Sequence, residues 1–120
     1  MRKIKETNPE LIETILFLKK QSKESGTKIW RSVAELLAKS RRKRITVNIS
    51  RLNRYAGKNE MVVVPGKVLG AGEIDHPVIV AAFAFTQNAR EKIKKARGKC
   101  LSIIEFAKKN PKGSKVKIIG

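Results

Sequence analysis

The sequence of 120 residues contains few sulfur and imidazole groups, since Cys100 is its only cysteine and His76 its only histidine. A lone cysteine cannot form an internal disulfide or supply a cysteine-rich zinc site. Cys100 stands in the apolar stretch KCLSII, a setting typical of a small core residue. These absences fit a protein of the reducing cytosol. We expect it to hold no metal and no cofactor.

Long apolar runs are also absent. No stretch of about 18 apolar residues occurs, which predicts that no segment spans a membrane. The first ten residues, MRKIKETNPE, pass from basic directly to polar residues, without the apolar segment of a secretory signal. We therefore expect a cytoplasmic protein that has no membrane partner.

Acidic residues are scarce. The chain has 10 Asp and Glu against 28 Lys and Arg, which gives a formal net charge of +18 and a sequence pI near 10.6. A compact body with this excess repels itself, so a large anionic partner is expected to offset the charge. Nucleic acid is the first candidate and an acidic membrane surface the second. Aromatic residues make up only 5%, and no RNP-type aromatic strand occurs, which argues against a single-strand reader of the RRM class.

The first part of the chain predicts a helical hairpin. Asn8 and Pro9 form a helix start, and Gly26 is a typical terminator. A second helix follows at once, in which Ile29 and Val33 share one face. The short link between the two predicts an antiparallel pair. The charge run KSRRKR ends the segment at Arg44.

From residue 45 onward, short strands and helices alternate, which predicts a domain of the α/β class. The stretches MVVV and VIVAAFAF are apolar at every position, as expected of strands that are covered on both faces. Thr86 caps one expected helix, and Ser102 with Glu105 forms a capping box for another. We expect strands at 45–49, 61–64, 78–85 and 115–119, and helices at 51–57, 87–97 and 103–110.

The stretch VVVPGKVLGAGEI has the outline of a phosphate-binding loop, but it fails both nucleotide fingerprints. A Walker loop requires a hydroxyl where Val68 stands and a glycine where Met61 stands. Asp75 takes the place of the third glycine in the dinucleotide fingerprint. The glycines therefore indicate backbone geometry, with Pro65-Gly66 expected to form a type II turn.

Catalytic residues are not indicated either. His76 precedes a proline in an expected loop, where a packing or solvent-facing role is the simpler interpretation. Glu73 and Asp75 could form an acid/base pair, but local ion pairs or turn hydrogen bonds suit two carboxylates of so basic a protein better. No nucleophile stands beside a base and an orienting group. We predict no enzyme activity and no small-molecule substrate.

The clearest chemical signal is the basic stretch RRKRITVNISRLNRYAGK. Arginine offers phosphate a planar fork of donors, and lysine offers a mobile point charge. Asn53 could bond a base edge or ribose, and Tyr55 could stack on an exposed base. Trp30 could pack between the first two helices or stack on a base, and packing is favoured. The candidate RNA-binding residues are Lys19, Lys20, Lys28, Arg31, Arg41, Arg42, Lys43, Arg44, Arg51, Asn53, Arg54, Tyr55, Lys58, Lys67, Lys112 and Lys115.

Five segments together resemble a known family. They are TNPELIETILFLKKQSKESGTKIWRSVAELL, VNISRLNRYAG, VVVPGKVLGAGEI, VIVAAFAFTQNAREKI and LSIIEFAKKNPKGSKVKIIG. In this order and spacing they are similar to the large-ribosomal-subunit "eighteen-e" family of archaea and eukaryotes, a relative of bacterial large-subunit protein fifteen.

This resemblance implies an α/β fold with an N-terminal helical hairpin, followed by a compact domain of irregular strand-strand-helix turns. It implies a structural, non-catalytic constituent of the large ribosomal subunit that binds and stabilises ribosomal RNA beside neighbouring ribosomal proteins. Residues 1–44 would form an RNA-facing helical extension and residues 45–120 the α/β core, as a single structural unit. The compact length favours an archaeal protein. The alternative is a free-standing DNA-compacting protein of chromatin type.

Overall fold

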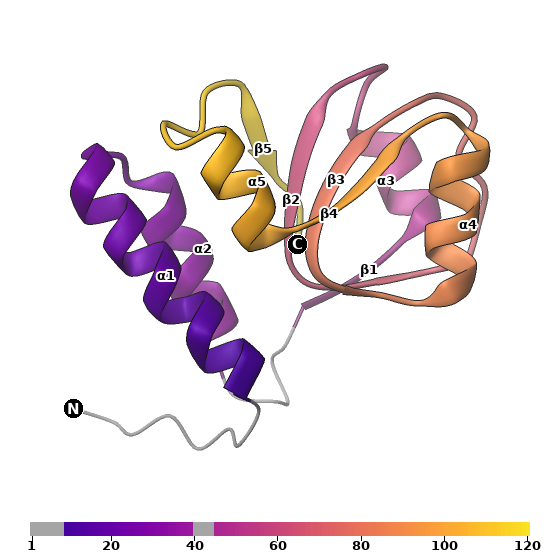
Figure 1. Cartoon of the computed structure of the whole chain (residues 1–120). Coiled ribbons are helices and arrows are strands. Elements are labelled where there is room, and N and C mark those ends of the chain that lie inside the picture. The colour runs from indigo at the N-terminus through magenta and orange to yellow at the C-terminus, as the bar shows by residue number, and fades with distance from the viewer. Residues whose placement is uncertain (1–8, 40–44) are drawn as a thin grey trace.

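The computed structural model describes residues 9–39 and 45–120 (Figure 1). Helices and strands alternate along these residues, so the predicted α/β class is confirmed. The candidate cations Arg41, Arg42, Lys43 and Arg44 lie outside the described residues. The elements are α1 (Pro9–Ser25), α2 (Ile29–Leu37), β1 (Ile45–Asn48), α3 (Ile49–Tyr55), β2 (Met61–Leu69), β3 (Ile79–Phe85), α4 (Gln87–Lys95), β4 (Lys99–Ser102), α5 (Ile103–Lys109) and β5 (Val116–Ile118).

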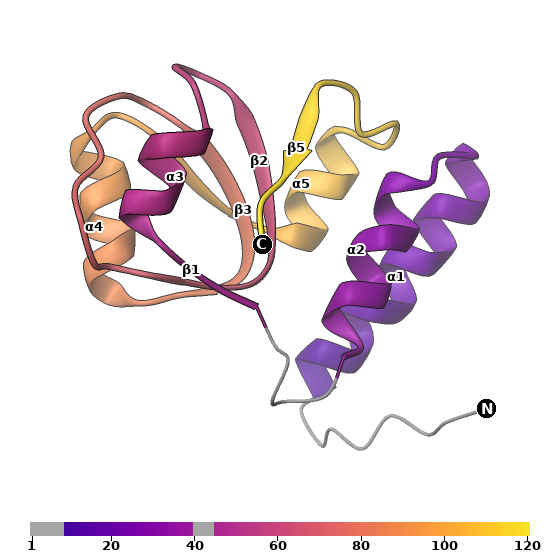
Figure 2. The same ribbon diagram turned by 180° about the vertical axis from the view of Figure 1, so that it is seen from behind.

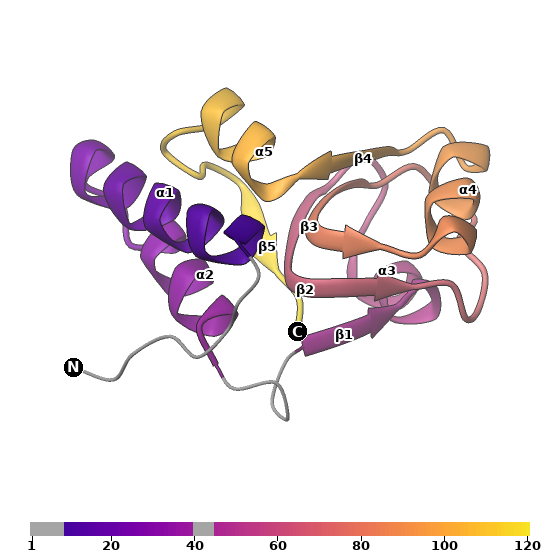
Figure 3. The same ribbon diagram turned by 60° about the horizontal axis from the view of Figure 1, so that its bottom comes forward.

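The strands form one parallel sheet with β2 at its centre. Along the main path the order is β1-β2-β3-β4, and β5 also pairs with β2 (Figure 3). β1 pairs with the second half of β2, from Gly66 onward, whereas β5 pairs with its first half, from Met61. Because β3 pairs along the other side of β2, β1 and β5 share one edge of the sheet.

Helices cover both faces of this sheet (Figures 1 and 2). Consecutive residues of a strand point to opposite faces. Accordingly, Val62 and Val64 join a core with α3 and α4, while Val63 joins a second core with α1, α2 and α5. The prediction that these apolar strands are covered on both sides is confirmed. The helices α1 and α2 lie side by side, as expected of a hairpin (Figures 1 and 2).

The expected type II turn at Pro65-Gly66 is wrong, because both residues lie inside β2. The pairing of β2 with β3 shifts register between Val64 and Lys67, so the two residues form an irregularity within the strand. Glycine is required at this position because β1 comes very close to the backbone of β2. A Cβ on Gly66 would lie 2.0 Å from the carbonyl oxygen of Ile45, so a side chain would separate β1 from β2.

Two of the cap signals in the sequence, Thr86 and Ser102, correspond to helix starts, while the expected cap Asn8 lies outside the described residues. The Thr86 hydroxyl accepts a hydrogen bond from the backbone N–H of Ala89 at the start of α4. Ser102 and Glu105 form the expected capping box of α5. The helix predicted over 87–97 stops earlier, at Lys95, and the strand β4 that follows was not predicted.

Trp30 connects the hairpin to the other end of the chain. Its side chain is fully buried, and its indole N–H donates to the carbonyl of Pro111 at 2.8 Å. The ring meets Phe106 of α5 edge-on, with 5.9 Å between the ring centroids. The interpretation of Trp30 as a packing residue is therefore confirmed, with α5 as a partner besides the hairpin. The only indole of the chain is thus held within the core.

Candidate nucleic-acid interface

Contacts within the protein hold the glycine loop after β2, so this loop does not form a phosphate-binding site. The ammonium of Lys92 on α4 donates to the carbonyls of Gly70, at 2.8 Å, and Gly72, at 2.6 Å. A phosphate-binding loop must instead direct backbone N–H groups at its ligand. The N–H of Ala71 already donates to the side chain of Asn48, at 3.3 Å. The loop therefore presents acceptors to a lysine, and its glycines are structural.

The side chains considered as an acid/base pair also make their contacts within the protein. Glu73 lies 3.7 Å from the ammonium of Lys92. The Asp75 carboxylate lies 2.8 Å from Nδ1 of His76, and Nε2 of His76 lies 2.6 Å from the Ala56 carbonyl. These contacts raise the pKa of His76, the hydrogen bond with Asp75 most and that with Ala56 next. The preference for local pairs over catalysis at these residues is confirmed.

The C-terminal end of α3 gathers exposed basic and aromatic groups. Tyr55 is half exposed, and the guanidinium of Arg51 lies 5.0 Å from the centre of its ring. Arg54 and Lys58 beside them are exposed. Arg51 also donates to the carbonyl of Gly120, at 3.2 Å, which joins α3 to the end of the chain beyond β5.

Lys117 on β5 extends this group. Its ammonium donates to the Tyr55 carbonyl at 2.9 Å and lies 3.3 Å from the Glu60 carboxylate. The pKa of Glu60 is lowered, chiefly by the N–H of Gly57 and then by Lys117. The charge of Lys117 is part of the net +18, but Lys117 is not among the candidate RNA-binding residues predicted from the sequence. The alternation in KVKII was the available signal, since Val116 and Ile118 pack inward and the lysines between and before them face out.

The loop between α5 and β5 brings in cations from the hairpin. Gly113 of this loop approaches Ile29 so closely that a Cβ there would lie 2.3 Å from the Ile29 side chain. Lys112 and Lys115 on the loop therefore lie near Lys28 at the start of α2, and all three are exposed. We call this combined surface the basic edge. It consists of Lys28, Arg31, Arg51, Arg54, Tyr55, Lys58, Lys112, Lys115 and Lys117.

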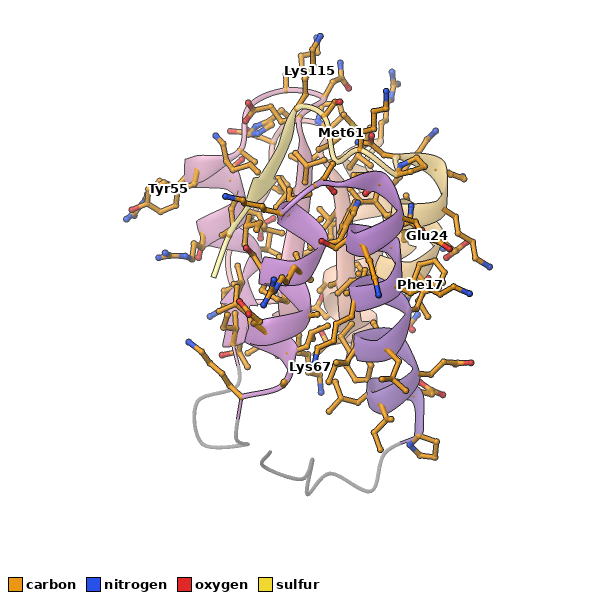
Figure 4. The ribbon with its side chains drawn as sticks, turned by 90° about the vertical axis from the view of Figure 1, so that its left-hand side faces the viewer. Phe17, Glu24, Tyr55, Met61, Lys67 and Lys115 are labelled. Carbon is orange, nitrogen blue, oxygen red and sulfur yellow. The ribbon has the colours of Figure 1, made fainter. Side chains whose placement is uncertain are left out.

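Figure 4 shows how the edge is oriented. Tyr55 points outward from α3 on one side, and Lys115 points outward from the loop before β5. Lys67 lies at the other end of this view, on the exposed part of β2, so the structure does not bring it to the basic edge. Lys19 and Lys20 are exposed on α1, which contributes no residue to the basic edge.

Two of the candidate RNA-binding residues already contact other groups of the protein. The side-chain oxygen of Asn53 accepts from the backbone N–H of Asp75 at 3.2 Å, which leaves its amide nitrogen for other contacts. Arg31 lies 3.6 Å from Glu35 one turn further along α2, but both side chains are mostly exposed. An exposed pair of this kind is weak and screened, so Arg31 still presents its charge to a partner.

Other kinds of site are absent from the described residues. Within residues 9–39 and 45–120, no three side chains of His, Cys, Asp or Glu come together as metal ligands. In the same residues, no helix has both the length and the apolar character needed to cross a bilayer. A folded body with a net charge of +18 and cations along one edge defines a basic, polyanion-binding α/β protein.

Comparisons with known proteins identify the family. A model described as "Ribosomal protein 60S L18 and 50S L18e" matches residues 4–120. A large ribosomal subunit protein eL18 of Methanothermobacter thermautotrophicus is 47% identical over 119 residues, which are 99% of this chain and 98% of the relative. The eL18 proteins of Methanococcus maripaludis and Methanoregula boonei are each 47% identical, over 119 and 118 residues. Those alignments cover 99% and 98% of this chain and 99% and 98% of the respective relatives.

The chain belongs to this family, the ribosomal proteins 60S L18 and 50S L18e. It is a structural constituent of the large subunit of the cytoplasmic ribosome, it is not an enzyme, and its relatives named above are archaeal. Ribosomal RNA and ribosomal proteins are its partners. The resemblance stated from the sequence is thus confirmed, and the chromatin-type alternative is not favoured.

Proposed function

We propose that the basic edge is the principal surface through which this chain holds the RNA of the large subunit. The observation that carries the proposal is the convergence of cations from α2, α3, the loop after α5 and β5 beside Tyr55, which is 49% exposed. Phosphate contacts supply affinity and position, whereas an aromatic ring can stack on an unpaired base.

Tyr55 and Arg51 would form a stacking platform within that surface. The guanidinium already covers one side of the ring, which leaves its other side for a base. Arg54 and Lys58 would neutralise phosphates on the flanking nucleotides. The candidates away from the edge, Lys19, Lys20 and Lys67, would contact other segments of the folded RNA, and the amide of Asn53 a base or ribose.

The test compares equal losses of charge at two places. Replacing both Arg54 and Lys58 by alanine should weaken binding to large-subunit ribosomal RNA and reduce the slope of log K against log salt by about two. Lys94→Ala with Lys95→Ala on α4 removes the same charge outside the edge and should change the slope less. Equal effects of the two double variants would refute a principal surface. Tyr55→Leu should weaken binding with little change in slope, because it removes stacking and no charge.

The run Arg41–Arg44 precedes β1 in the chain, and we propose that it also binds phosphate. Replacing all four residues by alanine should reduce the salt slope by about three to four if each touches a phosphate. Filter binding or fluorescence anisotropy across a salt series measures the slope. An unchanged slope would mean that this run is a solvated stretch without RNA contact.

We further propose that residues 1–44, an RNA-facing extension, and residues 45–120, the α/β core, fold as a single structural unit. Support comes from Trp30, which bonds the Pro111 carbonyl, and from a core that α1 and α2 share with Val63 of β2. The emission of Trp30 and the far-ultraviolet circular dichroism of the whole chain should then report one coincident unfolding transition. Two separated transitions would show that the parts unfold independently.

A further inference from the structure

The glycine loop, residues 70–76, forms neither helix nor strand, and it runs alongside α3. Near the start of α3, the N–H of Ser50 donates to the carbonyl of Ala71 at 3.1 Å. Further along the helix, the side-chain oxygen of Asn53 accepts from the N–H of Asp75 at 3.2 Å. The loop and the helix therefore advance in the same direction, with hydrogen bonds between them near the start and in the middle of α3.

A further contact of the loop lies at the end of α3, beside the proposed RNA surface. Nε2 of His76 is 2.6 Å from the carbonyl of Ala56, the residue that follows the helix. The adjacent carbonyl, that of Tyr55, accepts from the ammonium of Lys117 at 2.9 Å. Positive charge is favourable at the carbonyl end of a helix. The last turn of α3, which carries Arg54 and Tyr55, is thus held both by the glycine loop and by β5.

Lys92 of α4 fixes the same loop from another helix. Its ammonium donates to the carbonyls of Gly70, at 2.8 Å, and Gly72, at 2.6 Å, and it lies 3.7 Å from the carboxylate of Glu73. An ammonium has three N–H donors, so these three groups can occupy all of them. Lys92 is therefore directed at the loop and not at a phosphate.

The loop in turn lies against α3. Gly72 has a φ of 95°, and a Cβ there would lie 2.4 Å from the Cβ of Ser50. The helices α3 and α4 lie on the same face of the sheet and contribute to one core (Figures 1 and 2). The glycine loop thus connects Lys92 on α4 to the backbone of α3.

We propose that the glycine loop positions α3 for RNA and that Lys92 is the positioning residue that fixes the loop. This inference rests on the proposed RNA surface and adds a residue that acts through α3, without a contact of its own to RNA. An α-helix of seven residues is too short to persist alone, so the place of α3 depends on such contacts. A ring that is fixed in place before binding loses less conformational entropy when a base stacks on it.

A double-variant cycle on the full chain tests the proposal. Lys92→Met keeps an unbranched side chain and removes the ammonium, and it should weaken binding to large-subunit ribosomal RNA by about tenfold, as for the loss of one base stack. Lys94→Met removes the same charge from an exposed position of α4 and should weaken binding by about twofold at most. If Lys92→Met does not fold, Lys92→Gln, whose amide can still donate to one carbonyl, takes its place in the cycle.

The cycle separates positioning from direct contact. If Lys92 acts through α3, adding Lys92→Met to Tyr55→Leu should weaken binding little beyond Tyr55→Leu alone, because the stacking ring is already gone. A direct contact of Lys92 with phosphate would instead make the two effects multiply.

A second measurement requires no RNA. Tyr55 is the only tyrosine of the chain, so tyrosine labelled in its ring with a heavy carbon isotope gives NMR signals from one residue. In the free protein, Lys92→Met should shift or broaden these signals, and Lys94→Met should leave them in place. A loss of stability alone, with α3 still in its place, would leave them unchanged in both variants.

Three outcomes would overturn the inference. They are natural RNA affinity in Lys92→Met, effects of Lys92→Met and Tyr55→Leu that multiply, and Tyr55 signals that Lys92→Met does not alter. Natural affinity in Tyr55→Leu would refute the proposed stacking platform and this inference with it. A loss of affinity in Tyr55→Leu without one in Lys92→Met would refute this inference alone.

Discussion

At the level of single residues, both ring nitrogens of His76 face acceptors, the Asp75 carboxylate and the Ala56 carbonyl. A histidine donates from both nitrogens only as the imidazolium, so folding favours the protonated form and raises the pKa of His76. Glu60 adds a smaller attraction in the same direction.

The stability of the fold should therefore depend on the charge of His76. Because the folded-state pKa is above the ordinary value, the contribution is fully present below about pH 6.5 and is lost as pH rises through the folded-state pKa. Urea unfolding from about pH 5.5 to pH 8.5 should show a falling free energy of unfolding for the natural chain. His76→Gln should flatten this decline. An equal decline in the variant would assign the pH dependence to another group.

Gly66 gives a second test at a single position. Gly66→Ala should lower the free energy of unfolding by about 2–4 kcal/mol, because the added Cβ meets the backbone of Ile45, which cannot rotate away. Gly57→Ala is the matched control, since its Cβ would meet only the Glu60 side chain, at 3.4 Å. Urea unfolding measures both. Similar costs for the two variants would show that the approach of β1 is not what requires glycine at residue 66.

Among the secondary-structure elements, α5 depends on its capping box. The Ser102 hydroxyl accepts from the N–H of Glu105, while the Glu105 carboxylate accepts from the N–H of Ser102, which lowers the pKa of Glu105. Ser102→Ala should reduce the free energy of unfolding by about 1 kcal/mol. Because α5 carries Phe106 against Trp30, the indole emission reports the loss in denaturant titrations. Ser114→Ala, at an exposed position in the loop before β5, should change little, and a comparable loss there would contradict the capping explanation.

The elements also show how far local sequence determines the fold. Caps and apolar runs are local signals, so the helices starting after Thr86 and Ser102 and the valine-rich strand β2 could be predicted. The strand β4 could not, because two of its four residues are exposed and two only partly buried, and they become a strand by pairing with β3. Pro65-Gly66 matches a turn locally, and only the distant Ile45 makes it part of a strand.

The candidate interface, too, could be predicted only in part from the sequence. Composition identified the cations of α3 and the loop before β5, which are exposed as a basic patch requires. Their grouping came from contacts distant in sequence, such as Gly113 against Ile29 and Lys117 against Tyr55. In the sequence, Lys92 is one more cation of a basic helix, but the carbonyls of the glycine loop hold its ammonium, and no local pattern marks that role.

At the level of the whole molecule, the cations exceed what the acids can neutralise. Glu35, Glu60 and Glu73 already pair with Arg31, Lys117 and Lys92, and the total count leaves a net charge of +18. Mutual repulsion of the surplus destabilises the isolated chain. Salt screens this repulsion over a Debye length of about 10 Å at 0.1 M, and it also weakens attraction to phosphates.

Stability and RNA affinity should therefore respond to salt with opposite signs. The melting temperature of the free protein should rise by several degrees between low and moderate salt, since about 1 kcal/mol corresponds to roughly 4 °C in a chain of this size. If about six phosphates are neutralised, affinity for ribosomal RNA should fall about 10³-fold from 50 to 200 mM salt. Arg54→Glu with Lys58→Glu, which lowers the net charge, should weaken both responses. A melting temperature that falls with salt would mean that internal ion pairs outweigh the repulsion, and the surplus charge would then need no polyanion to offset it.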